Sequence, residues 1–239
     1  MMRIEFIRAF RDNYIWCLRA ANRAVVVDPG DAKPVLEYLA RESLTLVAIL
    51  NTHHHADHVG GNRELTQHQR VPVFGPRNEP IATVTHPVGE GECVKLPELG
   101  IEFTVIEIPG HTLGHVAYYG ANLLFCGDTL FGCGCGKLFE GSARQMHESL
   151  SKLAALAPET KVYCGHEYTL ANIAFAKTVE PENPELLARE RHDREAIDVN
   201  RPTLPSTIAE AASLHAGKEL RDPVEVFAEV RSWKDGFKA

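Results

Sequence analysis

The stretch Thr52-His-His-His-Ala-Asp-His58 begins one residue after the apolar run Val47-Ala-Ile-Leu50. Four imidazoles and a carboxylate therefore stand where a buried strand is predicted to end. Imidazole nitrogens and carboxylate oxygens are ligands that zinc, iron and manganese accept. The spacing His53-x-His55-x-Asp57-His58 supplies enough ligands for two metal ions. A solvated histidine tract is the alternative, but such tracts do not usually follow a buried strand and enclose an aspartate.

Three more candidate ligands repeat one pattern, in which an apolar run is followed by glycine and then by the ligand. Glycine permits a sharp exit from a strand, which swings the next side chain across the sheet edge. Several strands converging on one point would produce this repetition. The ligands are His111 after Ile106–Gly110, Asp128 after Leu123–Gly127, and His166 after Val162–Gly165.

These seven residues can be divided between two metal ions. One ion takes His53, His55 and His111, and the other takes Asp57, His58 and His166. Asp128 has two oxygens and can bridge both ions. Two cations acidify a bridging water, so that a metal-bridging hydroxide exists near neutral pH and hydrolysis is the expected reaction. We take the carboxylates Asp57 and Asp128 as the catalytic residues.

Composition places the chain among ordinary globular proteins. Of its 239 residues, 44% are hydrophobic and 24% are charged. The formal net charge of −7 argues against nucleic acid as a partner, and no apolar run approaches the roughly 20 residues of a membrane span. The first eight residues mix acid and base with apolar residues, unlike a secretory signal, and the six cysteines form no CxxC pair. We therefore expect a cytoplasmic protein.

The chain divides into two parts, a mixed region (1–166) and a helical region (167–239). The first is expected to form two sheets covered by helices, and the second, too small for its own core, to border the substrate site. No strand is expected after Glu167. Predicted strands are 4–10, 14–18, 24–27, 46–50, 71–74, 101–108, 116–119, 123–126 and 162–164, and predicted helices are 32–41, 142–156, 168–179, 184–199, 207–214 and 223–233.

The metal motifs resemble those of the metallo-β-lactamase superfamily. The resemblance lies in Thr52–His58, in Pro109-Gly-His-Thr-Leu-Gly-His115 and in Cys126-Gly-Asp128. It implies an α/β fold, a four-layer αββα sandwich with the metals at one edge of the sheets. Here that fold is expected to carry a C-terminal helical extension.

Further motifs resemble glyoxalase II, the hydroxyacylglutathione hydrolases. They include Gly134-Cys-Gly-Lys-Leu-Phe-Glu-Gly141, Val162-Tyr-Cys-Gly-His-Glu-Tyr-Thr169 and Pro202-Thr-Leu-Pro-Ser206. The resemblance implies hydrolysis of S-D-lactoylglutathione to glutathione and D-lactate by a monomer with two divalent metal ions, zinc first and iron or manganese as alternatives. It also implies that the residues contacting glutathione are Lys137, Tyr168, Arg231 and Lys234.

Two departures from the family pattern stand out. Phe139 replaces a tyrosine found in some members, and the stretch between Ser206 and Pro223 is short. Two other functions remain open at this stage: a glutathione-persulfide dioxygenase of the same superfamily with a single iron, and a metal-binding or redox module without turnover.

Three residues near the motifs receive lesser roles. Asp28 is expected to form a turn in Asp28-Pro-Gly30, with support of the metal site as the alternative. His54 is not assigned as a ligand, and His115 is expected at most to order the loop around His111.

Overall fold

The computed structural model describes residues 2–213 and 222–237. Among them, one six-stranded sheet has the order β1 to β6, and only its β1–β2 and β2–β3 pairs are antiparallel. Because β3 to β6 run parallel, the C-terminal end of β4 lies at the same edge of the sheet as those of its parallel neighbours. The strands are β1 (Arg3–Ala9), β2 (Asn13–Ala20), β3 (Arg23–Val27), β4 (Thr45–Leu50), β5 (Val73–Pro76) and β6 (His86–Val88).

The second six-stranded sheet has the order β14-β13-β10-β9-β8-β7, with β10 and β13 parallel and the other pairs antiparallel. A small sheet pairs β11 with β12. The strands are β7 (Cys93–Leu96), β8 (Ile101–Glu107), β9 (Val116–Gly120), β10 (Leu123–Gly127), β11 (Leu130–Phe131), β12 (Gly134–Cys135), β13 (Lys161–Cys164) and β14 (Ser206–Thr207).

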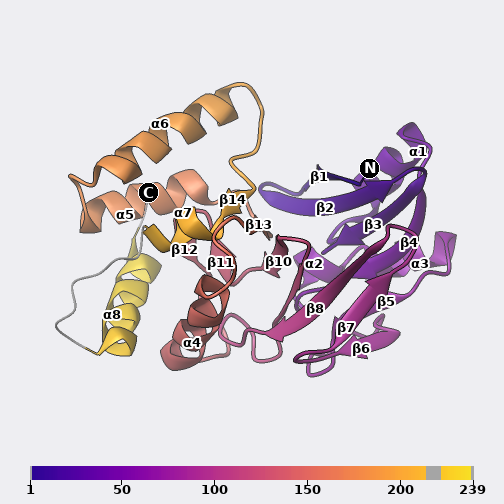
Figure 1. Ribbon diagram of the computed structural model, residues 1–239, viewed down its shortest axis with the longest axis horizontal. Coiled ribbons are helices and arrows are strands. Elements are labelled where there is room, and N and C mark those ends of the chain that lie inside the picture. Colours follow the sequence, from indigo (N-terminus) through magenta and orange to yellow (C-terminus); the bar gives the residue numbers. More distant parts are fainter. Residues whose placement is uncertain (1, 214–221, 238–239) are drawn as a thin grey trace.

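Helices lie outside the sheets, and those of the C-terminal half gather at one end of the molecule (Figure 1). Local capping explains where two of them begin: Ser142 caps α4 in a capping box with Gln145, and Asn183 caps α6, with Pro184 as its first residue. The helices are α1 (Ala32–Arg41), α2 (Ala56–Val59), α3 (Asn62–His68), α4 (Ala143–Ala154), α5 (Thr169–Val179), α6 (Pro184–Asp198), α7 (Ile208–Ser213) and α8 (Pro223–Gly236).

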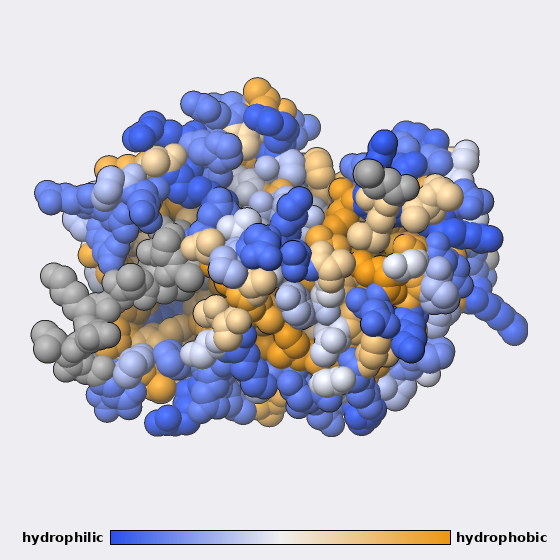
Figure 2. Space-filling model, in the orientation of Figure 1, coloured by the Kyte–Doolittle hydropathy of each residue, from blue (hydrophilic) through white to orange (hydrophobic). Residues whose placement is uncertain are grey.

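Alternation along the strands of the first sheet builds two cores. In β3, Val25 and Val27 join the core between the sheets, whereas Val26 faces the opposite side. On that side the strands pack against Val35 of α1 and Leu65 of α3. Hydrophilic residues cover most of the face shown in Figure 2, and hydrophobic ones appear mainly in the middle of that view.

The expected layered fold is confirmed, but the strand predictions are incomplete. They do not include β6, β7, β11 and β12, and one further expectation is wrong. The sequence predicts no strand after Glu167, yet β14 pairs antiparallel with β13 through Val162 and Ser206. A two-residue strand has no periodicity to detect, since its pairing partner alone defines it. The C-terminal region thus completes the edge of the second sheet. The predicted helix over 207–214 ends at Ser213 within the described residues, and half of the shortened stretch, residues 214–221, lies outside them.

Candidate metal centre

The 52–58 segment leaves β4 and is held in place by Asp28. This buried carboxylate accepts hydrogen bonds from Thr52 N at 2.8 Å and from Thr52 Oγ1 at 2.7 Å. Its Oδ2 also lies 3.2 Å from His58 Nδ1, which leaves Nε2 of that ring free to face the site. Of the two roles considered for Asp28, the structure therefore favours support of the metal site.

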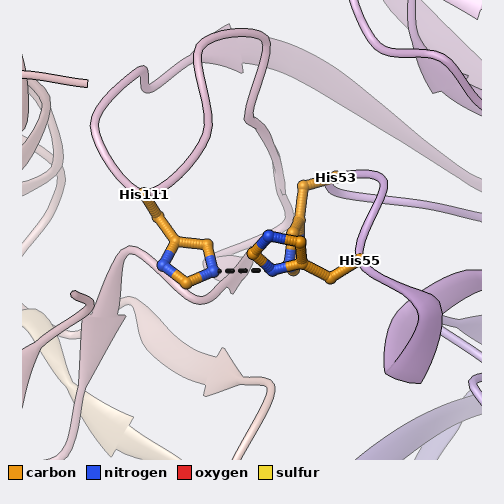
Figure 3. Close-up of side chains that lie close together, drawn as sticks. All are labelled: His53, His55 and His111. Carbon is orange, nitrogen blue, oxygen red and sulfur yellow. Dashed lines mark hydrogen bonds between the residues drawn. The ribbon is translucent and has the colours of Figure 1, made fainter. Parts of the chain in front are cut away.

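His53, His55 and His111 form the first group of candidate ligands. His55 Nδ1 lies 3.1 Å from His53 Nε2 and 3.0 Å from His111 Nε2. Figure 3 shows the three rings pointing toward one another, His111 coming from a different loop than the other two. Two nitrogens bound to one tetrahedral zinc lie about 3.3 Å apart, so the spacing of these nitrogens suits one shared ion.

Asp57, His58 and His166 form the second group. His58 Nε2 lies 3.3 Å from His166 Nε2 and 3.5 Å from Asp57 Oδ2, and His166 Nε2 lies 3.4 Å from the same oxygen. All three ligand atoms fall within 4.8 Å of one another.

Asp128 lies between the two groups. Its Oδ2 is 3.6 Å from His111 Nε2 and 3.2 Å from His166 Nε2, while its Oδ1 is 3.5 Å from His58 Nε2. Oδ1 is buried and has no hydrogen-bond partner among the described residues. A buried carboxylate oxygen without a donor fits a cation. These clusters suggest a binuclear metal site, and the residues present fit it.

Electrostatics divide the histidines into two classes. Burial lowers the pKa of His53 and of His111, so their rings are neutral near pH 7 and keep a nitrogen lone pair for a metal. Burial also lowers the pKa of His166, but hydrogen bonds, above all to Asp128, outweigh it and raise the pKa to about 10. A divalent cation would replace the proton that these carboxylates attract, because ligands bind in their deprotonated form.

The glycines before the ligands act in two different ways. Gly110 and Gly127 have φ angles of 155° and 47°, which a residue with a side chain rarely adopts. Gly165 instead provides space, since a Cβ there would lie 2.4 Å from Asp128 Oδ1. The sequence pattern predicts a sharp turn at each, and Gly165 departs from it.

Several residues that orient the ligands were not predicted. Asp12 Oδ1 lies 2.9 Å from His166 Nδ1, and Asn13 Nδ2 donates to Asp57 Oδ2 at 2.9 Å. Asp12 lies in the turn after β1, where polar residues are ordinary, and Asn13 is the first residue of β2. A polar pair at the start of this buried strand is the only signal that the sequence offers.

His115 and His54 lie beside the ligand groups. His115 Nε2 accepts a hydrogen bond from Asp128 N at 3.2 Å, and its ring stacks on His53 with centroids 4.6 Å apart. It therefore orders Asp128 as well as the neighbouring loop. The His54 ring instead contacts Glu79 and Glu140.

Two of the four residues predicted to bind glutathione lie next to the ligand groups. Tyr168 stacks on His166 with ring centroids 4.6 Å apart. Lys137 offers its carbonyl oxygen to His111 Nδ1 at 2.8 Å, and its ammonium lies 5.4 Å from the centroid of the Phe139 ring. Phe139 is 61% exposed and also packs edge-on against His111.

The other two predicted residues, both on α8, are engaged with the protein itself. Arg231 is buried, donating to Cys135 O at 2.9 Å and to Asp235 Oδ1 at 2.8 Å. Lys234 donates to Ala171 O at 3.2 Å. The structure thus places these cations against β12 and α5, the elements that adjoin Lys137 and Tyr168.

Comparison with known proteins places this fold and site in a family. A family model described as the metallo-beta-lactamase superfamily matches residues 9–166, and the chain therefore belongs to that superfamily. A model described as the hydroxyacylglutathione hydrolase C-terminus matches residues 167–237. The hydroxyacylglutathione hydrolase of Nitrosomonas eutropha is 51% identical over 249 residues, covering 97% of this chain and 98% of that protein. Within the superfamily, the chain belongs to the hydroxyacylglutathione hydrolases, the glyoxalase II family.

Solved structures share the fold. ETHE1 from Myxococcus xanthus is 29% identical with a TM-score of 0.63, covering 90% of this chain and 100% of that one. TTHA1623, solved in a di-iron-bound form, is 30% identical with a TM-score of 0.56, covering 67% of this chain and 90% of that one. Among the described residues, no helix is both long and apolar enough to cross a membrane.

Proposed function

We propose that the chain hydrolyses S-D-lactoylglutathione, and related S-acylglutathione thioesters, to glutathione and D-lactate or the corresponding acid. The chain is a thioester hydrolase of the hydroxyacylglutathione hydrolase family. The observation that carries the substrate assignment is the 51% identity over nearly the full length of both chains, which includes the helical region as well as the metal motifs.

The seven ligands would hold two divalent ions. We assign His53, His55 and His111 to one ion, Asp57, His58 and His166 to the other, and Asp128 to both; the donor distances given above support this division. Zinc is our first choice because the donors are mostly imidazoles, and iron and manganese accept the same set.

Hydrolysis moves the acyl group from sulfur to a water oxygen and releases the thiol. Bound cations would acidify a shared water and so supply a nucleophile near neutral pH. On the protein side, hydrogen bonds with His166 and His58 lower the pKa of Asp57, which keeps this carboxylate ionised. Asp128 likewise faces both groups as a carboxylate, since its pKa is also lowered: nearby His58 outweighs the effect of burial. We therefore assign Asp57 and Asp128 to catalysis as well as to metal binding.

Substrate recognition is assigned to the cations around the site. Glutathione carries two carboxylates, which cationic side chains can bind through charge-assisted hydrogen bonds. Contacts with the ligand-bearing loops support the assignment of Lys137 and Tyr168 to substrate binding. Packing against the neighbouring elements supports the same assignment for Arg231 and Lys234.

We further propose that residues 1–166 form the catalytic domain and that residues 167–239 form a helical region bordering the substrate site. Support comes from α8, whose Arg231 contacts Cys135, two residues before Lys137. A helical region in this place can shape glutathione binding without contributing a metal ligand.

The test is steady-state hydrolysis of S-D-lactoylglutathione beside a simple acetyl thioester, with the metal ions counted in the same sample. We expect two ions per chain and a strong preference for the glutathione thioester. Equal efficiency on both substrates would remove the glutathione assignment. One iron per chain, with oxygen consumed on glutathione persulfide, would indicate a dioxygenase instead.

A further inference from the structure

Glu79 is a buried carboxylate that the sequence motifs do not include. It lies between β5 and β6, and its side chain is only 1% exposed. A carboxylate taken out of water requires hydrogen-bond donors to offset the lost hydration. The hydrogen-bond donors to Glu79 therefore show which segments this carboxylate holds in place.

Both oxygens of Glu79 accept hydrogen bonds from ligand-bearing loops. Oε1 accepts from Thr112 Oγ1 at 2.6 Å and from Gly114 N at 2.9 Å. Oε2 accepts from His54 N at 2.8 Å and also contacts His54 Nδ1. One side chain thus joins two separate loops through four donor atoms.

The joined positions are next to metal ligands. His54 stands between His53 and His55, and Thr112 follows His111 directly. Gly114 allows the close approach, since a Cβ there would lie 2.7 Å from Glu79 Cγ.

The second group of ligands is oriented by other residues. Asp28 lies 3.2 Å from the His58 ring, and Asp12 lies 2.9 Å from the His166 ring. Among the contacts of the described residues, those of Glu79 do not include these two rings, so its influence is directed to the three-histidine group.

We propose that Glu79 is a positioning residue for the His53, His55 and His111 group, because it fixes the distance between the two loops that supply these ligands. The proposal rests on the ligand division of the proposed function. Residues that orient metal ligands typically change metal affinity by about 10- to 100-fold when mutated. Glu79→Gln keeps the size of the side chain, but its amide nitrogen cannot accept from a backbone N–H, so one loop loses its anchor.

The experiment measures metal affinity and not turnover. Zinc is titrated into the metal-free full-length protein against a competing chromophoric chelator. Glu79→Gln is compared in two backgrounds: His166→Ala, which disables the second group, and His111→Ala, which disables the first. We expect affinity to fall about 10- to 100-fold in the His166→Ala background and by less than about 3-fold in the other.

The matched control is Glu140→Gln. Glu140 belongs to the same network, lying 3.3 Å from His54 Nε2 and accepting from Leu113 N at 2.9 Å, but its side chain is 35% exposed. Water can replace its contacts, so zinc affinity is expected to stay within about 3-fold of the parent.

The melting temperatures of the metal-free variants distinguish a purely structural role of Glu79 from the proposed positioning role. Equal affinity losses in both backgrounds, or unchanged affinity in the His166→Ala background, would overturn the proposal. If Glu79→Gln does not fold, Thr112→Val removes one donor to the same carboxylate and is expected to shift affinity in the same selective way. Hydrolysis by the wild-type protein tests the proposed function separately, because it does not depend on Glu79 acting as proposed.

Discussion

Tyr14→Phe tests how the helical region is attached to the metal-binding region. Tyr14 is 1% exposed and its hydroxyl donates to Glu167 Oε2 at 2.6 Å. The same carboxylate accepts from Thr203 N at 2.9 Å and from Thr203 Oγ1 at 2.7 Å. Glu167 directly follows His166, a proposed metal ligand, so this cluster connects β2, the proposed metal site and the C-terminal region.

The expected loss of stability follows from the charge on the acceptor. A hydrogen bond to a charged group contributes about 1.5–3 kcal/mol, and the substitution removes one such bond while the ring keeps its packing. For a chain of this size each kcal/mol corresponds to about 2–4 °C, so the melting temperature should fall by about 3–12 °C. Burial, together with the Glu167 hydrogen bond, also raises the pKa of Tyr14, so the hydroxyl remains a donor across the working pH range.

Thermal and guanidinium unfolding of the metal-free protein measure the effect. Tyr163→Phe is the matched control, because Tyr163 is also buried but no hydrogen bond of its hydroxyl is found among the described residues; it should change stability by less than about 0.5 kcal/mol. A double-mutant cycle with Thr203→Val should show coupling, since both residues donate to one carboxylate. A loss below about 0.5 kcal/mol for Tyr14→Phe would show that Glu167 does not hold the two regions together.

Three further predictions concern the site. Asp128→Ala should lower metal content at both positions, whereas His111→Ala should lower it at one; elemental analysis with two ions retained in Asp128→Ala would contradict the bridging role. Lys137→Ala should lower kcat/KM for S-D-lactoylglutathione by roughly 10- to 150-fold with metal content unchanged, and a smaller effect would argue against its contact with substrate. Gly165→Ala should weaken zinc binding in chelator competition, because its Cβ would lie 2.4 Å from Asp128 Oδ1 and 2.6 Å from His58 Cε1; wild-type affinity would show that the loop can shift.

Local patterns were sufficient to predict the layered fold and to nominate the ligands. Ala24–Val27 and Leu46–Leu50 are apolar throughout, because β3 and β4 are covered on both faces. An apolar run that is followed by glycine and a candidate ligand can likewise be recognised without knowing which strands it pairs with. The short strand β14 could not be predicted, since only its pairing with β13 defines it.

Residues that orient the ligands escaped prediction for a related reason. Asp12 and His166 are 154 positions apart, Asn13 and Asp57 are 44 apart, and Glu79 and His54 are 25 apart. Asp12 and Glu79 are ordinary polar residues in a turn or loop, and Asn13 is the first residue of β2. The role of each exists only through the contact. A ligand motif can be recognised within one segment, because the metal sets which residue types it needs. These contacts join separate segments and become visible only in the folded structure.

The placement of Arg231 and Lys234 explains in physical terms how the helical region can contribute to the neighbouring site. Arg231 donates to Cys135 O, two residues before Lys137, and Lys234 donates to Ala171 O, three residues after Tyr168. Each cation of α8 therefore fixes a segment that carries one of the other two proposed substrate residues. Arg231 is buried, and its charged guanidinium is the group that donates to the β12 segment. Its charge therefore cannot be removed without also removing this contact. Removing α8 would disturb the positions of Lys137 and Tyr168 as well as removing two charges, while every proposed metal ligand lies outside that helix.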